Sequence, residues 1–242
     1  MTTIGIIGLG KMGHAITALL ETEQSMDFHL FPRLSDQNQD LLKTCNVVIE
    51  FTTPEAAPGV IRHCLKSQIP VVSGTTGWHE YHLAEITTLC QDTNGKFLHA
   101  SNFSVGMNIV FALNRRLTTI LNQFREFVPS IREIHHIHKK DAPSGTALTL
   151  IDDIISYHSD YSGYGLNDPS NTLQGDIFHV TALREGDVKG FHEVAWNSGL
   201  EKITIAHEAF DRKVFASGAI MAARWLADQG PGTYTMKDII RL

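Results

Sequence analysis

The sequence lacks most features of membrane, secreted and nucleic-acid-binding proteins. Its 242 residues contain no uninterrupted apolar run of about 20 residues, so no membrane span is predicted. No basic residues precede the first apolar segment, and we therefore expect no signal peptide. Only three cysteines are present, without Cys-x-x-Cys spacing, which favours reduced thiols in the cytoplasm over a disulfide framework. The net charge of −6 argues against the basic surface that a dedicated nucleic-acid binder needs.

Charged residues are also scarce. They make up 19% of the chain, whereas 43% of the residues are hydrophobic, so the chain can bury a substantial core and is not disordered. In an acidic protein, an anionic ligand has to be held by a local cluster of basic groups.

The first half of the chain alternates strand-like and helix-like segments. Short apolar runs lie at 3–7, 28–31, 47–51, 71–72 and 96–100, and helical patterns lie at 11–23, 55–68 and 79–92. This alternation predicts an α/β domain of Rossmann type, with a parallel sheet flanked by helices.

The pattern changes after about Gly106. A long apolar helix is predicted at 107–121, a strand at 131–137, a loop at 157–173, antiparallel strands across 176–205 and a final helix at 214–226. These segments predict a second, smaller α+β domain with a mixed or antiparallel sheet. The final helix has an apolar face that can return to the first sheet.

A glycine motif follows the first strand directly and opens the first helix. Its residues fit the G-x-G-x-x-G pattern of dinucleotide-binding loops and are Gly8, Leu9, Gly10, Lys11, Met12 and Gly13. The first glycine allows a tight turn, the second lets a pyrophosphate approach the backbone, and the third allows helix and strand to pack closely. The helix N-terminus then offers N–H groups to the phosphates. A glycine-rich turn without a ligand is the alternative interpretation.

The acidic residue that usually binds the adenosine ribose is missing. The second strand ends in Phe31-Pro32-Arg33, and Arg33 can pair with a 2′-phosphate or stack on the adenine. We therefore expect NADPH to bind at least as well as NADH. A solvated surface arginine is the alternative.

Two further turns follow the fourth and fifth strands. One contains Gly74, Thr75 and Thr76, and the other contains Ala100, Ser101, Asn102 and Phe103. Open α/β sheets bind ligands beyond the carboxyl ends of their strands, so both turns are candidates for holding a nicotinamide cofactor.

The run 133–147, EIHHIHKKDAPSGTA, concentrates basic residues in this acidic chain. Its histidines and lysines are followed by a Pro-Ser-Gly-Thr turn that opens another helix. Hydroxyl and N–H groups at such a turn can hold a carboxylate, a lysine attracts an anion, and a histidine can exchange a proton near neutral pH. These residue types favour hydride reduction of an anionic substrate.

Two other interpretations of this run compete. His135, His136 and His138 could bind a metal ion, but strand alternation sends His135 to the opposite face from the other two. The adjacent lysines would also repel a cation, so we expect no metal. The run could instead be a solvated basic surface without a function.

The same run closely resembles the signature of the dihydrodipicolinate reductase family, also called 4-hydroxy-tetrahydrodipicolinate reductase. The segments GLGKMG, VVIEFTTPEA, GTTG and ASNFSVGMN are similar to the cofactor-side motifs of that family and come in the same order. The segment ALREGDVKGFHEV is similar to a later part of its pattern.

The resemblance implies a dinucleotide-binding domain at 1–105 plus 210–242, and a substrate-binding and tetramerisation domain at 106–209. It implies a homotetramer that uses NADPH or NADH to reduce 4-hydroxy-tetrahydrodipicolinate, a small dicarboxylate. The product is tetrahydrodipicolinate, formed with loss of water in bacterial lysine and diaminopimelate synthesis.

By this resemblance, His135 is the acid–base residue and Lys139 the proton donor or electrostatic partner. The substrate contacts implied are His136, Lys139, Ser144, Gly145 and Thr146. The glycine loop and the two later turns are implied to hold the cofactor. The rival functions are an NAD(P)H reductase for another imine or keto acid, and a dinucleotide-sensing regulator. A regulator has no use for a histidine–lysine cluster beside an anion-binding turn.

Overall fold

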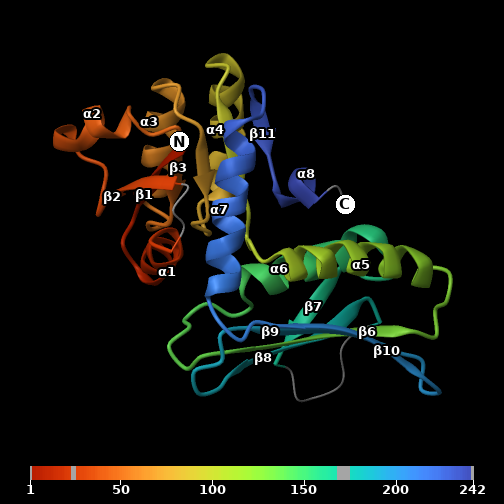
Figure 1. The fold of residues 1–242 in the computed structure, drawn as a ribbon. Helices are drawn as coiled ribbons and strands as arrows, with labels where there is room; N and C mark the ends of the chain where they lie inside the picture. The colour runs from red at the N-terminus through yellow and green to blue at the C-terminus, as the bar shows by residue number, and fades with distance from the viewer. Residues whose placement is uncertain (1, 23–25, 168–174, 241–242) are drawn as a thin grey trace. The chain divides into compact units, whose positions relative to one another are not determined.

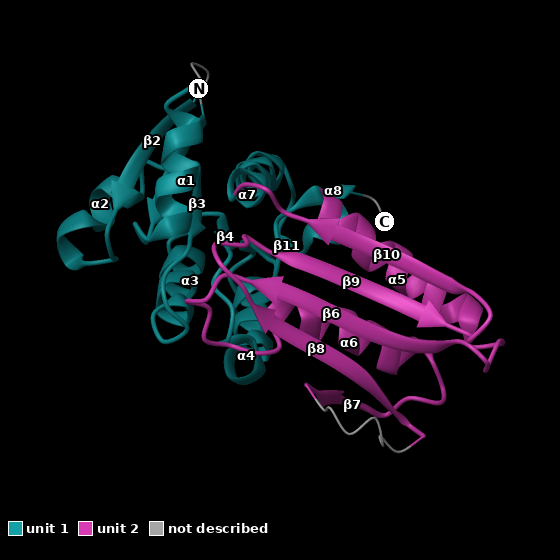
Figure 2. Ribbon diagram, turned by 90° about the horizontal axis from the view of Figure 1, so that it is seen from below, with its two compact units in different colours: residues 1–105, 212–242 teal, residues 106–211 magenta. Residues whose placement is uncertain are grey.

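The computed structural model describes residues 2–22, 26–167 and 175–240. The chain forms two compact units, termed unit 1 (residues 1–105 and 212–242) and unit 2 (residues 106–211), as Figure 2 shows. Among the described helices, none combines the length and the apolar character needed to cross a membrane.

Unit 1 contains a six-stranded sheet whose neighbouring strands are all parallel. In the order β11-β5-β4-β3-β1-β2, its strands are β1 (Thr2–Ile7), β2 (Met26–Phe31), β3 (Val47–Glu50), β4 (Val71–Ser73), β5 (Lys96–His99) and β11 (Gly232–Tyr234). All of β3 and β4 is buried, which explains why their sequences are continuous apolar runs rather than alternating ones. The short edge strand β11 was not predicted.

Helices cover both faces of this sheet (Figure 1). On one face pack α1 (Lys11–Leu20), α7 (Lys213–Ala227) and α8 (Met236–Ile240), and on the other α2 (Gln39–Leu42), α3 (Ala57–Lys66) and α4 (His79–Asp92). The return of the final helix to the first sheet is therefore confirmed.

Unit 2 contains a five-stranded mixed sheet. In the order β10-β9-β6-β8-β7, its strands are β6 (Val128–His135), β7 (Gly163–Leu166), β8 (Ile177–Arg184), β9 (Phe191–Asn197) and β10 (Lys202–Glu208). Two helices, α5 (Val105–Leu121) and α6 (Gly145–Tyr157), pack with the sheet in one hydrophobic core (Figure 1). The Rossmann-like sheet and this second, mixed sheet confirm the predicted fold class.

Three details of unit 2 differ from the sequence predictions. The segment 176–205 was predicted to form antiparallel strands, and β9 and β10 do pair in this way, but β8 pairs in parallel with β6 and β7 because it lies between those two strands and not beside β9. The predicted strand 131–137 ends at His135, so the following histidines lie in a loop. The predicted loop 157–173 contains β7, and its residues 168–173 lie outside the described part of the chain.

Candidate active site

The glycine loop joins β1 to α1, and its glycines have different surroundings. A side chain at Gly8 would place its Cβ 2.1 Å from the carbonyl oxygen of Phe51. One at Gly13 would place it 2.1 Å from the carbonyl oxygen of Gly8. Gly10 instead faces open space, with none of the described atoms within 4 Å of that position. A ligand can therefore approach the backbone at Gly10, where the first N–H groups of α1 lack helical partners.

A cavity of about 690 Å³ adjoins this loop, within the size range of small-molecule sites. Its lining comes from the glycine loop, the end of β2, the turn after β3 and the start of α3, and consists of Gly8, Gly10, Pro32, Arg33, Leu34, Phe51, Thr52, Thr53, Ala56, Gly59 and Val60. Arg33 is exposed, and the described residues of this lining include no acid. The cavity therefore fits the adenosine side of a dinucleotide and offers a cation near it.

Glu50 is a fully buried carboxylate at the end of β3. It accepts hydrogen bonds from the hydroxyls of Ser73 and Thr75, the latter at 2.9 Å. It also accepts from the N–H and the hydroxyl of Thr52, at 3.1 and 2.8 Å. Thr52 belongs to the turn after β3 and Thr75 to the turn after β4. One carboxylate therefore fixes two neighbouring turns, and it does so through neutral donors.

The turn after β4 packs tightly against its surroundings. A Cβ at Gly74 would lie 2.1 Å from the Phe51 ring, so only glycine fits there. Thr75 is buried and its carbonyl oxygen accepts from the indole N–H of Trp78 at 2.8 Å, whereas Thr76 is exposed. Thr76 is thus the part of this turn most open to a ligand.

The turn after β5 is held by α7. A Cβ at Gly218 would lie 1.9 Å from the carbonyl oxygen of Phe103, so the helix backbone touches the turn directly. Ala100 and Phe103 are buried, Asn102 is half-buried, and Ser101 is exposed. Because β1, β4 and β5 are parallel, the three predicted cofactor turns lie at the same edge of one sheet.

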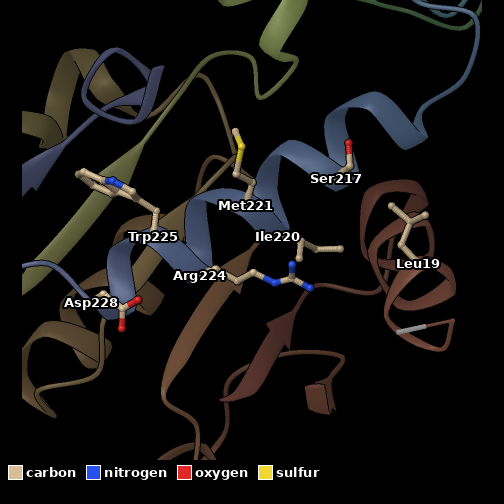
Figure 3. Close-up of a pocket in the computed structure, with 7 residues that line it drawn as sticks. All are labelled: Leu19, Ser217, Ile220, Met221, Arg224, Trp225 and Asp228. Atoms are coloured by element: carbon tan, nitrogen blue, oxygen red, sulfur yellow. The ribbon is translucent and has the colours of Figure 1, made fainter. Parts of the chain in front are cut away.

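A second hollow of unit 1, of about 550 Å³, runs along α7 and α1 (Figure 3). Its lining consists of Leu19, Ser217, Ile220, Met221, Arg224, Trp225 and Asp228. The basic residue of this lining, Arg224, points its Nε at the sulfur of Met26, 3.2 Å away. The lining contains no predicted site residue, and we place no part of the candidate cofactor site in this hollow.

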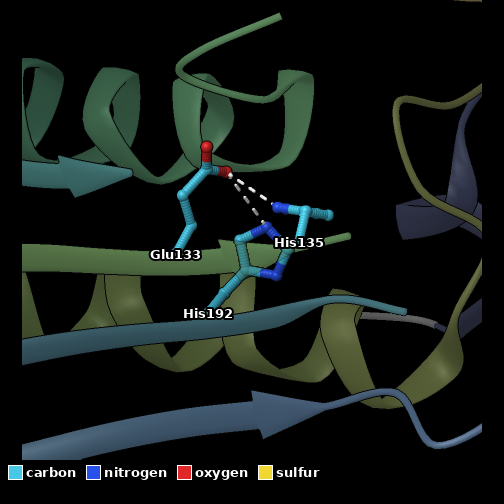
Figure 4. Close-up of side chains that lie close together, drawn as sticks. All are labelled: Glu133, His135 and His192. Atoms are coloured by element: carbon cyan, nitrogen blue, oxygen red, sulfur yellow. Dashed lines mark ion pairs between the residues drawn. The ribbon is translucent and has the colours of Figure 1, made fainter. Parts of the chain in front are cut away.

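In unit 2, the end of β6 carries two titratable side chains on its buried face. Glu133 and His135 are 0% and 8% exposed, and strand alternation places both on the side of the hydrophobic core. His192 of β9 is the register partner of Glu133 and is also buried. Figure 4 shows both imidazoles directed at the Glu133 carboxylate. Oε2 of Glu133 lies 3.5 Å from Nδ1 of His135 and 3.6 Å from Nε2 of His192.

Two further elements contact Glu133. The N–H of Ser144, the N-cap of α6, faces both carboxylate oxygens at 3.1 and 3.2 Å. Nη2 of Arg184, at the end of β8, lies 3.2 Å from Oε1. The Ser144 hydroxyl accepts from the N–H of Ala147 and lies 3.2 Å from Nε2 of His192. The buried carboxylate of β6 thus connects β8 and β9 to the first turn of α6.

The remaining predicted substrate residues lie in the loop after β6 and at the start of α6. Lys139 is half-buried, and its Nζ lies 2.8 Å from both carboxylate oxygens of Asp141. The Arg184 guanidinium donates to the backbone carbonyl oxygens of Lys139 and Asp141 and so fixes this loop. The His136 ring lies 6.2 Å from that of His138.

Gly145 and Thr146 form the first turn of α6, directly after Ser144, the N-cap that Glu133 holds. Gly145 is half-buried and Thr146 is buried. The first N–H groups of this helix and its positive dipole end favour an anion.

The pKa values of this cluster are strongly displaced. Burial lowers the pKa of His135 to about 3, with further lowering by His192, Lys139 and Arg184 that outweighs the opposing effect of Glu133. Burial alone would raise the pKa of Glu133, but hydrogen bonds from His192 and Ser144 and the nearby imidazoles lower it to about 2. At neutral pH, His135 is therefore neutral and Glu133 is ionised.

Glu133, His135 and His192 place potential ligand atoms within 4.8 Å of one another, a spacing that a metal ion could use. This trio differs from the three histidines weighed in the sequence. The same carboxylate already faces the Arg184 guanidinium and the Ser144 N–H, and a bound cation would lie beside that positive charge. We interpret the trio as a polar network around the buried Glu133–Arg184 ion pair.

Sequence reasoning assigned no role to Glu50, Glu133, Arg184 or His192. A signal was available for the two carboxylates. Glu50 interrupts a continuous apolar strand, and Glu133 shares the inward face of a strand with His135. A charged residue at such positions needs buried partners. The identity of those partners depends on strand pairing, which the sequence pattern does not give.

Comparison with known families decides the assignment. Residues 2–103 match the model of the dihydrodipicolinate reductase N-terminus, and residues 106–240 match that of its C-terminus. The chain belongs to the dihydrodipicolinate reductase family. The N-terminal domain of this family is its NAD(P)-binding Rossmann domain, and its members are oxidoreductases that use NADH or NADPH. In this chain, the last part of the C-terminal match, α7 onwards, belongs to unit 1.

Individual relatives agree with this assignment. The chain is 38% identical over 240 residues to a 4-hydroxy-tetrahydrodipicolinate reductase of Christiangramia forsetii, covering 98% of this chain and 97% of that protein. It is 33% identical over 235 residues to the enzyme of the same name from Alkaliphilus metalliredigens, covering 96% of each chain. A dipicolinate-bound dihydrodipicolinate reductase from Paenisporosarcina sp. TG-14 has the same fold, with a TM-score of 0.74, 20% identity and 99% coverage of each chain.

Proposed function

We propose that this chain reduces 4-hydroxy-tetrahydrodipicolinate to tetrahydrodipicolinate with NADPH or NADH, as a step of lysine and diaminopimelate synthesis. In the balanced reaction, the substrate loses water and gains a hydride from the cofactor and a proton. The observation that carries the proposal is the buried Glu133–His135–His192 cluster beside the α6 N-terminus, in a chain matched by the family along its length.

The substrate side of the site suits a dianion. We assign one carboxylate to the first turn of α6, where Ser144, Gly145 and Thr146 offer backbone N–H groups and hydroxyls at the positive end of the helix. We assign Lys139 and His136 to charge and hydrogen-bond contacts with the substrate. The Paenisporosarcina relative is described with dipicolinate bound, which is a planar ring with two carboxylates. Because Lys139 faces Asp141, a substrate carboxylate has to compete for its ammonium.

His135 and Lys139 are the groups assigned to proton transfer. Bound NAD(P)H supplies the hydride, and negative charge then develops on the substrate ring. The Lys139 ammonium can donate a proton as it stands. His135 is neutral in the free protein, but an adjacent dianion favours its protonated form and raises its pKa. His135 can then carry a proton to the ring.

The cofactor side is assigned to the glycine loop Gly8–Gly13, the turn Gly74–Thr76 and the turn Ala100–Phe103. Arg33 is assigned to the 2′-phosphate of NADPH. In Arg33→Ala, we expect the KM for NADPH to rise several-fold while that for NADH stays unchanged. Equal increases for both cofactors would instead indicate stacking on the adenine, and unchanged KM values for both would show that Arg33 is a solvated surface residue.

We also propose that the protein works in the cytoplasm as a homotetramer assembled through unit 2. The described helices of unit 2 share the core on one face of its sheet, and the other face includes Val128, which is 51% exposed. Light scattering coupled to size-exclusion chromatography measures the assembly directly, and a monomeric mass would reject it.

One assay tests the proposed reaction. The substrate is made in situ from pyruvate and aspartate semialdehyde, and the loss of NAD(P)H absorbance is followed. We expect turnover that depends on both precursors. A reductase for another imine or keto acid would consume NAD(P)H only with that other compound, and a regulator would bind the cofactor without consuming it.

A further inference from the structure

Glu133 has more partners than its charge requires. The carboxylate has no exposed surface, so its charge must be compensated inside the protein. Arg184, 3.2 Å from Oε1, supplies one positive charge and would be sufficient for neutrality. The carboxylate nevertheless also faces the ring nitrogens of His135 and His192 and the N–H of Ser144. These contacts connect it to groups that the proposed function places in the substrate site.

The first connection fixes the protonation pattern of His135. Burial keeps this imidazole neutral, so one ring nitrogen carries a proton and the other a lone pair. Nδ1 makes no hydrogen bond to the described residues and lies 3.5 Å from the Glu133 carboxylate. Because a carboxylate accepts but cannot donate, its charge favours the proton on Nδ1. Nε2 keeps its lone pair. A Cβ at Gly190 would lie 3.4 Å from Nε2, so the glycine leaves space on that side of the ring.

The second connection fixes the turn that opens α6. The backbone N–H of Ser144 donates to the same carboxylate, and the Ser144 hydroxyl caps the helix through the N–H of Ala147. Moving the Glu133 carboxylate would therefore displace Ser144 together with Gly145 and Thr146, which follow it directly. The orientation of the proton-exchanging ring and the position of the carboxylate-binding turn thus depend on one side chain.

We propose that Glu133 is a positioning residue that orients His135 with its lone pair on Nε2 and holds the α6 turn for the substrate carboxylate. The inference rests on the proposed function, because the proposed function gives His135 and the α6 turn their roles in the substrate site. It differs from a purely structural ion pair with Arg184, which predicts no effect on the tautomer of His135.

The test compares Glu133→Gln with the wild-type holoenzyme. The Gln side chain keeps the shape but introduces an N–H₂ donor, which can force the His135 proton from Nδ1 to Nε2. We expect kcat to fall by roughly 100-fold or more, as when a histidine loses the carboxylate that fixes its tautomer. The KM for the dicarboxylate should rise by about 5-fold because one hydrogen bond to the turn is weakened. The KM for NAD(P)H should stay within about twofold.

Long-range ¹H–¹⁵N spectra of the histidine rings give a readout that a structural role would not move. The His135 signals are assigned by their loss in His135→Gln. We expect the Nδ1–H tautomer in wild type and a shift toward Nε2–H in Glu133→Gln. Glu201→Gln is the matched control, because it removes the same charge from an exposed position of unit 2.

Folded Glu133→Gln protein with kcat within twofold of wild type, or with an unchanged His135 spectrum, would overturn the proposal. If the Gln variant does not fold, Glu133→Asp decides the question. The Asp side chain keeps the negative charge, so this variant should preserve the Nδ1–H tautomer of His135 and lose less than about 10-fold in kcat. An altered tautomer together with a wild-type kcat would reject the positioning role of Glu133. If wild type does not reduce 4-hydroxy-tetrahydrodipicolinate, the proposed function fails, and the ring spectra still test the Glu133–His135 contact separately.

Discussion

Each unit of the molecule buries one carboxylate beside its candidate binding turns, and the two differ in what surrounds them. Glu50 in unit 1 accepts hydrogen bonds from hydroxyls and an N–H group, all of them neutral. Glu133 in unit 2 faces a guanidinium, two imidazoles and an N–H group. Both anchor turns, but only the second is next to groups that can exchange protons.

This difference corresponds to a difference in chemistry. A dinucleotide brings its own reactive group, so the protein has only to hold it, and neutral donors fix loops without adding titratable groups. The reduction of a dicarboxylate also needs a proton, and a carboxylate among imidazoles couples the position of a ring to its protonation. In the proposed function, the Glu50 network therefore serves cofactor binding and the Glu133 network serves proton handling.

The largest effect is expected from His135→Gln. If the Glu133 network handles the proton, kcat should fall by about 10²- to 10⁴-fold, with a much smaller change in either KM. Steady-state kinetics with both reactants varied measure this, and His138→Gln, an exposed neighbour in the following loop, is the control. A loss confined to the KM for NAD(P)H would reverse the assignment of the two networks.

Lys139→Ala should have the next largest effect. Loss of a charge-assisted contact with the dianion should raise the KM for the dicarboxylate by about 10- to 100-fold, and kcat should fall as well. Lys140→Ala removes the adjacent, exposed charge and should be close to wild type. A kinetically silent Lys139→Ala would show that unit 2 holds its anion without this lysine.

Glu50→Gln should act on the cofactor alone. An amide cannot accept all the hydrogen bonds that the carboxylate accepts, so the turns at Thr52 and Thr75 should loosen. We expect the KM for NADPH and NADH to rise by about 3- to 10-fold, with kcat nearly unchanged. Glu55→Gln, an exposed carboxylate of the turn before α3, is the control. If kcat falls instead and the KM values stay constant, the contrast between the two carboxylates is wrong.

The smallest effect concerns stability in acid. The pKa of His135 is about 3 in the folded protein, below its ordinary value of 6.5. Between these two pH values, the unfolded chain binds a proton at His135 and the folded chain does not. Stability present above pH 6.5 is therefore lost as the pH falls toward 3, by roughly 1.5 kcal/mol between pH 6.5 and 5.

Urea unfolding at several pH values checks this. His135→Gln should remove that part of the pH dependence, and His138→Gln should keep it. Equal slopes in both variants would contradict the attribution of this pH dependence to burial of the His135 imidazole.

The features predictable from the sequence were those encoded by neighbouring residues. The position of the glycine loop between β1 and α1, the fold class and the family assignment depend on local spacing, and each was confirmed. The antiparallel arrangement predicted across 176–205 was wrong for β8, because parallel partners are selected by long-range packing that alternation in one strand does not report.

The same limit applies to the site. Arg184 reaches Glu133 from 51 residues further along the chain, and His192 reaches it from another strand. The motif 133–147 indicated where the chemistry lies, because its residue types are unusual. It could not indicate which side chains orient His135, since those partners arrive only when the second sheet assembles.

The contribution of α7 and β11 to the first sheet has a consequence for biosynthesis of the protein. A ribosome releases residues 1–105 long before it releases Ala216, Ala219 and Ile220, which complete one hydrophobic core of unit 1. Until then, the part of the sheet face that α7 covers exposes isoleucine and valine side chains to solvent. Residues 106–211 are contiguous and can become compact first. The unit whose synthesis begins first is thus the one that is completed last.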